Sequence, residues 1–189
     1  MAEKGDLKKA ITLFTKCIEQ DSSIYDAYLY RGDSKRMMED YAGALSDYNR
    51  AILLVKDDYR GYFKRALANC MLKNYTGALK DFDSSLDLNP GNGKVLLGRG
   101  CARYLAGDFK GAILDLTKAL EHNSHNGLAA FSRAAAREDS GDIKGAIEDY
   151  KLAASLNPDL KVMDYFLRKA ESKLSEKKSS KEVLSEIAP

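Results

Sequence analysis

A ten-residue pattern recurs along this chain at a constant interval. Its copies begin at Gly43, Gly77, Gly111 and Gly145 and read GALSDYNRAI, GALKDFDSSL, GAILDLTKAL and GAIEDYKLAA. We call the 34-residue interval between them the repeat period. A period of this length indicates a repeat architecture, in which each copy is one unit that stacks on its neighbours to bury its apolar face. The period constrains the fold more than any other feature of the sequence.

Small and large apolar residues share one helical face of this pattern. An alanine column is followed four residues later by a large apolar column and three residues after that by a second small column, and such spacings place side chains on one side of a helix. The pattern therefore predicts a helix whose small residues let a second helix approach closely. The columns are Ala10, Ala44, Ala78, Ala112 and Ala146; Phe14, Tyr48, Phe82, Leu116 and Tyr150; and Cys17, Ala51, Ser85, Ala119 and Ala153.

Another helical segment precedes each copy, as in YDAYLYRGDSKRMM at 25–38. The two segments are joined by only two or three residues, such as Gly107-Asp108, which suits an antiparallel hairpin. Pro90 and Pro158 close two of the repeats because proline cannot continue a helix. No long stretch alternates with a period of two residues, so the sequence predicts an all-α stack of helical hairpins.

This arrangement resembles the tetratricopeptide repeat (TPR) family over most of the chain. The residues that carry the resemblance are Tyr62, Ala66, Ala78, Phe82 and Pro90 in one copy and Gly107, Ala112, Ala146, Tyr150 and Pro158 in later ones. The chain departs from the family pattern in having no Trp, Leu96 and Ala130 at the first-helix aromatic position, and an arginine in place of the motif's leucine. The resemblance implies a right-handed solenoid of antiparallel helix hairpins whose first helices line a concave, peptide-binding groove.

The period divides residues 1–178 into a single array followed by a tail. The array consists of a half-repeat (1–22), full repeats at 25–58, 59–92, 93–126 and 127–160, and a capping helix at 161–177 that covers the last hairpin. Residues 179–189 are a polar tail, which we expect to be frayed or disordered.

An arginine column and an aspartate column run through the full repeats. The separation between each arginine and the aspartate that follows it is constant, and the half-repeat has Leu13 at the aspartate position and no upstream arginine. This agreement predicts structural ion pairs within each hairpin rather than a ladder of arginines that reads phosphates. The predicted pairs are Arg31 with Asp47, Arg65 with Asp81, Arg99 with Asp115, and Arg133 with Asp149.

Composition and motifs argue against several classes of function. The 30 Lys and Arg nearly balance the 28 Asp and Glu, which speaks against a nucleic-acid surface. We expect no membrane insertion and a cytoplasmic location, because no signal peptide or long apolar run is present and three cysteines do not form a disulfide framework. His122 and His125 are expected in a solvated loop without further metal ligands. We therefore predict no catalytic residues, no cofactor, no metal site and no enzyme activity.

The expected partner is another protein. In the TPR family the first helices line the groove, and in this chain the corresponding positions are apolar in the centre and cationic at the edges. We therefore predict a protein–protein interaction scaffold or adaptor that binds an apolar or amphipathic segment. The predicted groove residues are Arg60, Phe63, Lys64, Leu67, Met71, Lys94, Cys101 and Tyr104.

Two other functions remain open at this point. One is a co-chaperone with a diverged carboxylate clamp, the site by which some TPR domains hold a C-terminal Glu-Glu-Val-Asp; of the clamp positions only Lys94 matches, while the others hold Leu29, Asp33, Lys64 and Gly98. The second is an assembly module of a larger TPR protein. The wide apolar arc of residues 5–19, a second helix without its own first helix, predicts self-association through the half-repeat or an upstream extension.

Overall fold

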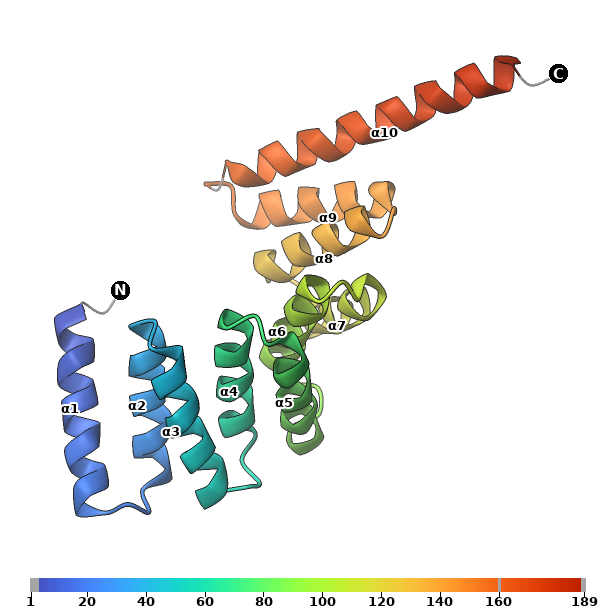
Figure 1. Ribbon diagram of the computed structural model, residues 1–189. Coiled ribbons are helices and arrows are strands. Elements are labelled where there is room, and N and C mark those ends of the chain that lie inside the picture. Colours follow the sequence, from blue (N-terminus) through green and yellow to red (C-terminus); the bar gives the residue numbers. More distant parts are fainter. Residues whose placement is uncertain (1–3, 160, 188–189) are drawn as a thin grey trace. The chain divides into compact units, whose positions relative to one another are not determined.

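The computed structural model describes residues 4–159 and 161–187, with side chains described up to residue 176. These residues form helices throughout, joined by short turns (Figure 1). The helices are α1 (Lys4–Gln20), α2 (Tyr25–Met37), α3 (Tyr41–Leu54), α4 (Tyr59–Met71), α5 (Tyr75–Leu88), α6 (Gly93–Leu105), α7 (Phe109–His122), α8 (Gly127–Asp139), α9 (Ile143–Leu156) and α10 (Val162–Ile187).

The helices pair in sequence as antiparallel hairpins, which confirms the predicted all-α fold. Within the hairpins, successive first helices (α2, α4, α6, α8) begin one repeat period apart, and so do successive second helices (α3, α5, α7, α9). The chain divides into two compact units, Met1–Ala102 and Arg103–Pro189, with the boundary inside α6. The handedness of a superhelix involves both units and stays a prediction.

The turn between the two helices of each hairpin explains why the repeated pattern begins with glycine. The N-terminal cap of each second helix is Asp40, Asn74, Asp108 or Asp142, whose side chain accepts a hydrogen bond from the backbone N–H of the glycine three residues later. A Cβ at Gly43 would lie 2.1 Å from Oδ2 of Asp40, so a side chain at this position would displace the cap.

Each apolar core combines one hairpin with the first helix of the next. Tyr48 of α3 and Phe82 of α5 are fully buried, and the small residues Ala68 and Ala102 of the following first helices pack against them. In the second unit, Tyr150 of α9 is surrounded in the same way by α8 and by α10. The alternation of small and large columns thus produces interlocking between repeats, as the sequence predicts.

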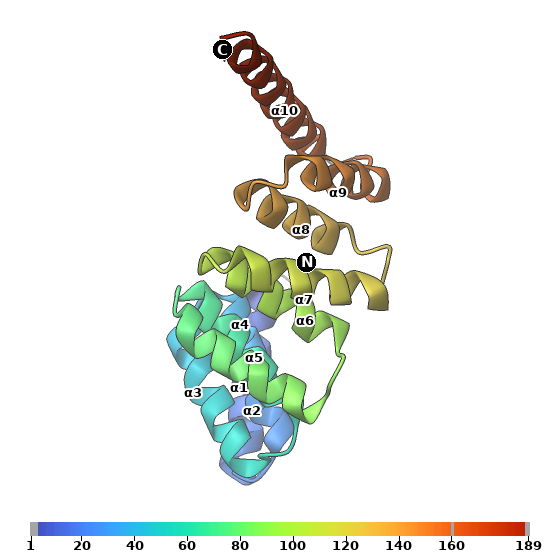
Figure 2. The same cartoon turned by 90° about the vertical axis from the view of Figure 1, so that its right-hand side faces the viewer.

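Helix α10 covers the last hairpin but extends further than predicted. Met163 and Ala170 are buried, and Phe166, Leu167 and Leu174 pack against the core of α8 and α9. Figure 2 shows the first part of α10 beside α9. The helix continues to Ile187 through a segment that we expected to be frayed or disordered. Lys, Glu and Leu favour helices and neither Gly nor Pro interrupts residues 162–187, which accounts for the difference. None of the described helices combines the length and apolar character that a membrane span requires.

Candidate functional site

The exposed face of the first helices α2 and α4 carries several predicted groove residues of the first unit. Arg60 lies 3.3 Å from Asp26 of α2 and 2.7 Å from Asp58, and Lys64 forms an ion pair with Asp33 of α2. The ion pair with Asp58 raises the pKa of Arg60. The cations expected to edge the groove are therefore engaged by carboxylates of the chain itself.

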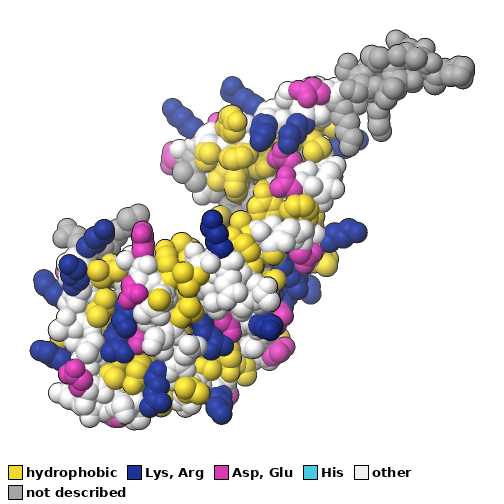
Figure 3. Space-filling model, viewed as in Figure 1, with side chains coloured by type: hydrophobic (Ala, Val, Ile, Leu, Met, Phe, Trp, Pro, Cys, Tyr) yellow, Lys and Arg dark blue, Asp and Glu magenta, His cyan; other side chains and the backbone are white. Residues whose placement is uncertain are grey.

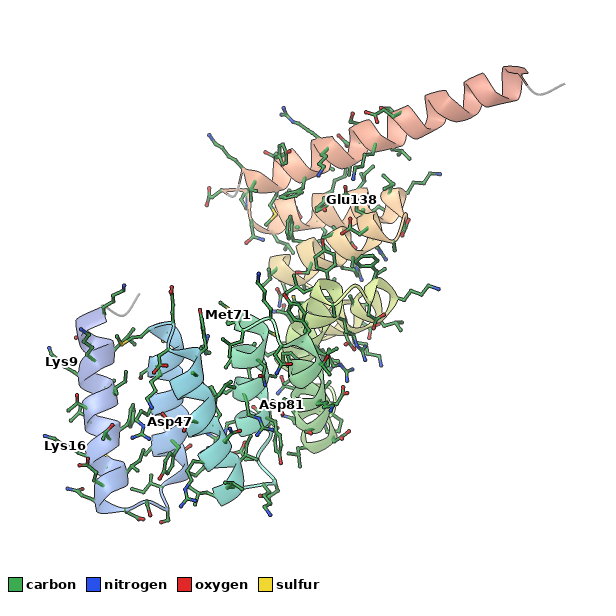
Figure 4. The ribbon with its side chains drawn as sticks, in the orientation of Figure 1. Lys9, Lys16, Asp47, Met71, Asp81 and Glu138 are labelled. Carbon is green, nitrogen blue, oxygen red and sulfur yellow. The ribbon has the colours of Figure 1, made fainter. Side chains whose placement is uncertain are left out.

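The apolar residues predicted for this face differ in how much they are exposed. Phe63 and Leu67 are half-buried and pack against the core of the second hairpin, where the ring of Phe63 lies 6.2 Å from that of Phe82. The side chain of Met71, in contrast, is 55% exposed at the end of α4 (Figure 4). Phe63 and Leu67 thus contribute mainly to the hydrophobic core, whereas the side chain of Met71 is exposed to solvent and can contact a partner.

Met37 belongs to the same face and, like the predicted groove residues, is a first-helix position outside the core columns. It stands one repeat period before Met71, at the equivalent end of α2, and is 52% exposed. Tyr30, also on α2, is 44% exposed and its ring stacks on Phe14 of α1 at 5.9 Å. The signal was present in the sequence, since both methionines share one repeat position. We call Tyr30, Met37 and Met71 the methionine face; hydrophobic side chains gather there at the upper end of α4 in Figure 3.

The remaining predicted groove residues lie in different settings. Lys94 is exposed on α6, and Cys101 is half-buried on the same helix. Burial, aided by the nearby Cys101, raises the pKa of the Cys70 thiol to about 11, so Cys70 is no activated nucleophile. Tyr104 belongs to the second unit, where its hydroxyl donates a hydrogen bond to Asp139 at 2.9 Å. Its placement beside Phe63 stays a prediction.

The predicted arginine and aspartate columns form bidentate contacts in three hairpins. Arg31, Arg65 and Arg133 each donate from Nε and Nη2 to both carboxylate oxygens of the paired aspartate, at 2.6–3.0 Å. Asp47, Asp81 and Asp149 are buried on the second helices, and the first two are labelled in Figure 4. Arg99 and Asp115 belong to different units, and their pairing stays a prediction.

A second column of polar residues, four positions after each arginine, also contacts the buried aspartates. Lys35 lies 2.8 Å from Asp47, Arg103 lies 2.8 Å from Asp115, and Arg137 lies 3.0 Å from Asp149. At the equivalent position Asn69 donates to Asp81 at 3.2 Å. Sequence reasoning missed this column, even though three of its four members are cations on one turn of a helix with the arginines.

An open hollow of about 430 Å³ lies over one of these pairs, on the side of the second helices. The hollow is lined by the ion pair of Arg65 with Asp81. Its other lining residues include Leu45 and Asn49 of α3 and Lys80 and Ser84 of α5. Because both oxygens of Asp81 already accept hydrogen bonds, the hollow offers no unsatisfied carboxylate to a ligand.

The described residues hold no group of three or more His, Cys, Asp or Glu side chains that could bind a metal ion. His122 is the last residue of α7 rather than a loop residue, and His125 is exposed in the turn that follows. Arg31, Arg65 and Arg133 are engaged in structural ion pairs, and the methionine face, with its exposed apolar side chains, is a candidate binding surface.

Comparison with known proteins agrees with this geometry. A family model for the tetratricopeptide repeat matches residues 31–93 and 97–160, whereas no curated protein sequence matches the chain. A solved tetratricopeptide repeat protein from Parabacteroides merdae shares 20% identity at a TM-score of 0.78, covering 98% of this chain and 75% of that one. YrrB, described as a TPR protein with an unusual peptide-binding site, shares 18% identity at a TM-score of 0.74, covering 87% and 84%. The first TPR of Spaghetti (RPAP3), bound to the HSP90 peptide SRMEEVD, shares 22% identity at 0.61, covering 62% and 94%. At these identities the likeness establishes the fold alone.

Proposed function

Because the chain belongs to the tetratricopeptide repeat family, whose members generally bind proteins, we propose that it is an adaptor that holds an apolar or amphipathic protein segment on the methionine face. The observation that carries the proposal is the pair of equivalent, half-exposed methionines at the ends of α2 and α4, Met37 and Met71. Methionine is flexible and polarisable, so a row of such side chains adapts to the apolar side of a bound segment.

The charges around this face favour an apolar partner over an acidic one. Arg60 and Lys64 are already paired with Asp26 and Asp33, so an acidic peptide has to break these contacts before it gains its own. The hydroxyl of Tyr48 donates a second hydrogen bond to Asp33 at 2.9 Å, which fixes that carboxylate on the face. A fixed negative charge at this position repels a carboxylate ligand.

The same contacts speak against the diverged co-chaperone as the alternative. The Spaghetti domain binds a peptide that ends in Glu-Glu-Val-Asp, whereas three of the equivalent clamp positions in this chain are a buried Leu29, the paired Asp33 and the paired Lys64. YrrB is described as a TPR protein with an unusual peptide-binding site, so TPR proteins differ in where they bind peptides.

The proposal is tested by selecting peptides of about 15 residues from a displayed library against the full chain and titrating the best one into variants. We expect selection of sequences with apolar residues at helical spacing. Met37→Lys and Met71→Lys should each weaken binding by at least about tenfold, as for interface hot spots. Leu53 of α3 is also an exposed apolar residue, so Leu53→Lys is the control and should bind as the parent chain does.

Selection of purely acidic peptides, or equal affinity of the Met71→Lys and Leu53→Lys variants, would contradict the proposal. Phe63→Ala combined with Tyr104→Ala tests the wider predicted groove. We expect a loss of more than about 2 kcal/mol in binding free energy if that groove extends over both residues.

A further inference from the structure

Helices α1 and α10 carry the residue patterns of the two different halves of a hairpin. Met163 and Ala170 of α10 stand one repeat period after Ala129 and Ala136 of α8, and all four are buried, so α10 follows the pattern of a first helix. Residues 7–20 of α1 follow the pattern of a second helix, with Leu13 standing one repeat period before Asp47. Helix α10 therefore matches the first helix of a hairpin, and α1 matches the second helix of a hairpin.

Helices α1 and α10 differ from the full repeats in a correlated way at the position of the ion pair. Where the hairpins pair arginine with a buried aspartate, α10 has Leu167, which is half-buried against the core of the last hairpin, and α1 has Leu13. The side chain of Leu13 is 62% exposed, and it borders a shallow hollow of about 420 Å³ together with Lys8, Lys9 and Thr12. Both members of the ion pair are replaced by leucine, as expected if the two positions meet each other.

The charges that flank the two leucines are also complementary. Lys9 and Lys16 lie four residues before and three after Leu13, and Figure 4 shows both lysines on the side of α1 that faces away from α2. Asp164 and Glu171 lie three residues before and four after Leu167, and both are exposed. In an antiparallel hairpin that brings the leucines together, Lys9 lies beside Glu171 and Lys16 beside Asp164.

The full hairpins show that this pairing of positions is the one the fold produces. In the last hairpin, Nη1 of Arg137 donates to the carbonyl oxygen of Gly145 at 3.2 Å. Arg137 is the repeat equivalent of Glu171, and Gly145 is the repeat equivalent of Lys9. The same contact recurs between Arg103 and Gly111 at 3.3 Å.

We propose that copies of this chain associate head to tail, with α10 of one copy and α1 of the next forming a composite hairpin around Leu167 and Leu13. The contact uses different surfaces on the two copies, so it is heterologous and extends into chains or closes into rings. It uses no residue of the methionine face and does not rest on the peptide-binding proposal.

The composite hairpin packs less closely than a full one. Gly32, Ala66, Gly100 and Ala134 provide the small position of the first helices, and α10 has Arg168 there. Arg168 would face Phe14, the equivalent of Tyr48, as a cation over an aromatic ring. Two exposed ion pairs within each copy also have to break before the new pairs form: Lys9 with Asp6 at 3.9 Å and Glu171 with Lys151 at 3.7 Å. We therefore expect weak association, with a dissociation constant on the order of 10–100 μM.

Sedimentation velocity of the full chain between about 5 and 300 μM tests the contact. The parent chain should show a sedimentation coefficient that rises with concentration, and the rise should diminish at high salt because screening weakens the charge pairs. Lys9→Glu with Lys16→Glu should weaken association at least about tenfold, as should Asp164→Lys with Glu171→Lys. Lys110→Glu with Lys118→Glu, which changes two exposed lysines of α7, is the control of matched charge.

A charge exchange separates this contact from any other mode of association. The two reversed variants are each impaired alone, but a mixture of them, or a single chain that carries all four changes, restores opposite charges across the contact. We expect both to regain concentration-dependent sedimentation. All four residues are exposed, so circular dichroism should show unchanged helix content. A parent chain that is monomeric at the highest concentration, or an association that the reversals leave unchanged, overturns the proposal.

Discussion

Arg65 donates from Nη1 to Oδ1 of Asn49 at 2.7 Å, while its Nε and Nη2 hold the carboxylate of Asp81. One guanidinium on α4 thereby joins α3 of the preceding repeat to α5 of its own. The other repeats contain the equivalent contact: Arg31 with Thr15 at 3.2 Å, Arg99 with Asp83 at 2.7 Å, and Arg133 with Thr117 at 3.1 Å. The arginine column therefore connects neighbouring repeats as well as the two helices of a hairpin.

The pair of Arg65 with Asp81 should show strong energetic coupling. The side chain of Asp81 is only 7% exposed, and replacement of Arg65 by Ala leaves its carboxylate with Asn69 as the remaining partner. The variant should therefore lose about 3 kcal/mol of unfolding free energy. Asp81→Ala should have a similar cost, and the double variant should recover part of the loss. Urea unfolding of the four chains measures the coupling, with the exposed Arg50→Ala as control. Additive losses would contradict the interaction.

The contact between Arg65 and Asn49 should contribute less. Asn49 is exposed, so Asn49→Ala should cost about 0.5–1 kcal/mol and lose its effect once Arg65 is Ala. Because the bond joins two repeats, its loss should also lower the cooperativity of unfolding, seen as a reduced denaturant slope. A slope identical to that of the parent chain would show that the arginine does not couple the repeats.

The turn inside each hairpin contains one residue in the left-handed region. The residues are Glu39 (φ 67°), Lys73 (φ 57°), Gly107 (φ 85°) and Gly141 (φ 93°). Gly141→Ala should lower the unfolding free energy by about 1 kcal/mol, because a Cβ is strained at this φ. The matched control is Gly5→Ala in α1, where an added Cβ meets nothing within 4 Å. This variant should stabilise the helix by a few tenths of a kcal/mol, because alanine favours helices more than glycine does. Thermal melts compare them, and equal effects of the two changes would refute the explanation.

The sequence predicted the hairpins closely, because their determinants are local and repeated. The regular recurrence of small and large columns fixed the helix pairs, and buried Ala44, Ala78 and Phe82 occupy the positions expected for them. The polarity of residues 179–189 predicts a disordered tail, whereas α10 continues to Ile187 because the segment's helix propensity is high.

The candidate site was harder to predict because its properties depend on neighbours distant in the sequence. The sequence does not show that Asp33 neutralises Lys64 or that Asp26 lies beside Arg60. Nor does it show that Phe63 turns toward Phe82 whereas Met37 and Met71 remain at the surface. Column position indicates which helix face a residue lies on, but exposure is set by how far the next repeat covers that face.

A peptide that ends in Glu-Glu-Val-Asp should not bind this chain. Asp33 lies at a clamp position and is held there by Lys64 and by the hydroxyl of Tyr48, so it repels the peptide carboxylates. We expect no saturable signal in fluorescence anisotropy up to about 100 μM peptide. Asp33→Asn removes the repulsion and serves as the companion variant. Affinity near 10 μM that is lost when the peptide's terminal carboxylate is amidated would show that a clamp exists here.

The attachment of α10 should weaken in acid through Glu138. This carboxylate lies in the last turn of α8 and accepts hydrogen bonds from Lys173 of α10 and from the hydroxyl of Tyr150, the latter at 2.9 Å (Figure 4). Burial alone would raise the pKa of Glu138, but Lys173 and Tyr150 outweigh it and hold the pKa below its ordinary value. A depressed carboxylate pKa means that its stabilisation is complete above the pKa of the unfolded chain and is lost as the pH falls through the folded value.

We therefore expect Glu138→Gln to destabilise the chain at pH 6 and to have progressively less effect as the pH falls below about 4. The readout is the difference in unfolding free energy between parent and variant across this range, since other carboxylates titrate equally in both. Hydrogen exchange of the α10 amides gives the local counterpart, with faster exchange in the variant at pH 6 and convergence in acid. Glu148→Gln, an exposed glutamate of α9, provides the control and should show no such pH dependence. A difference for Glu138→Gln that stays constant with pH would mean that its charge does not hold α10 in place.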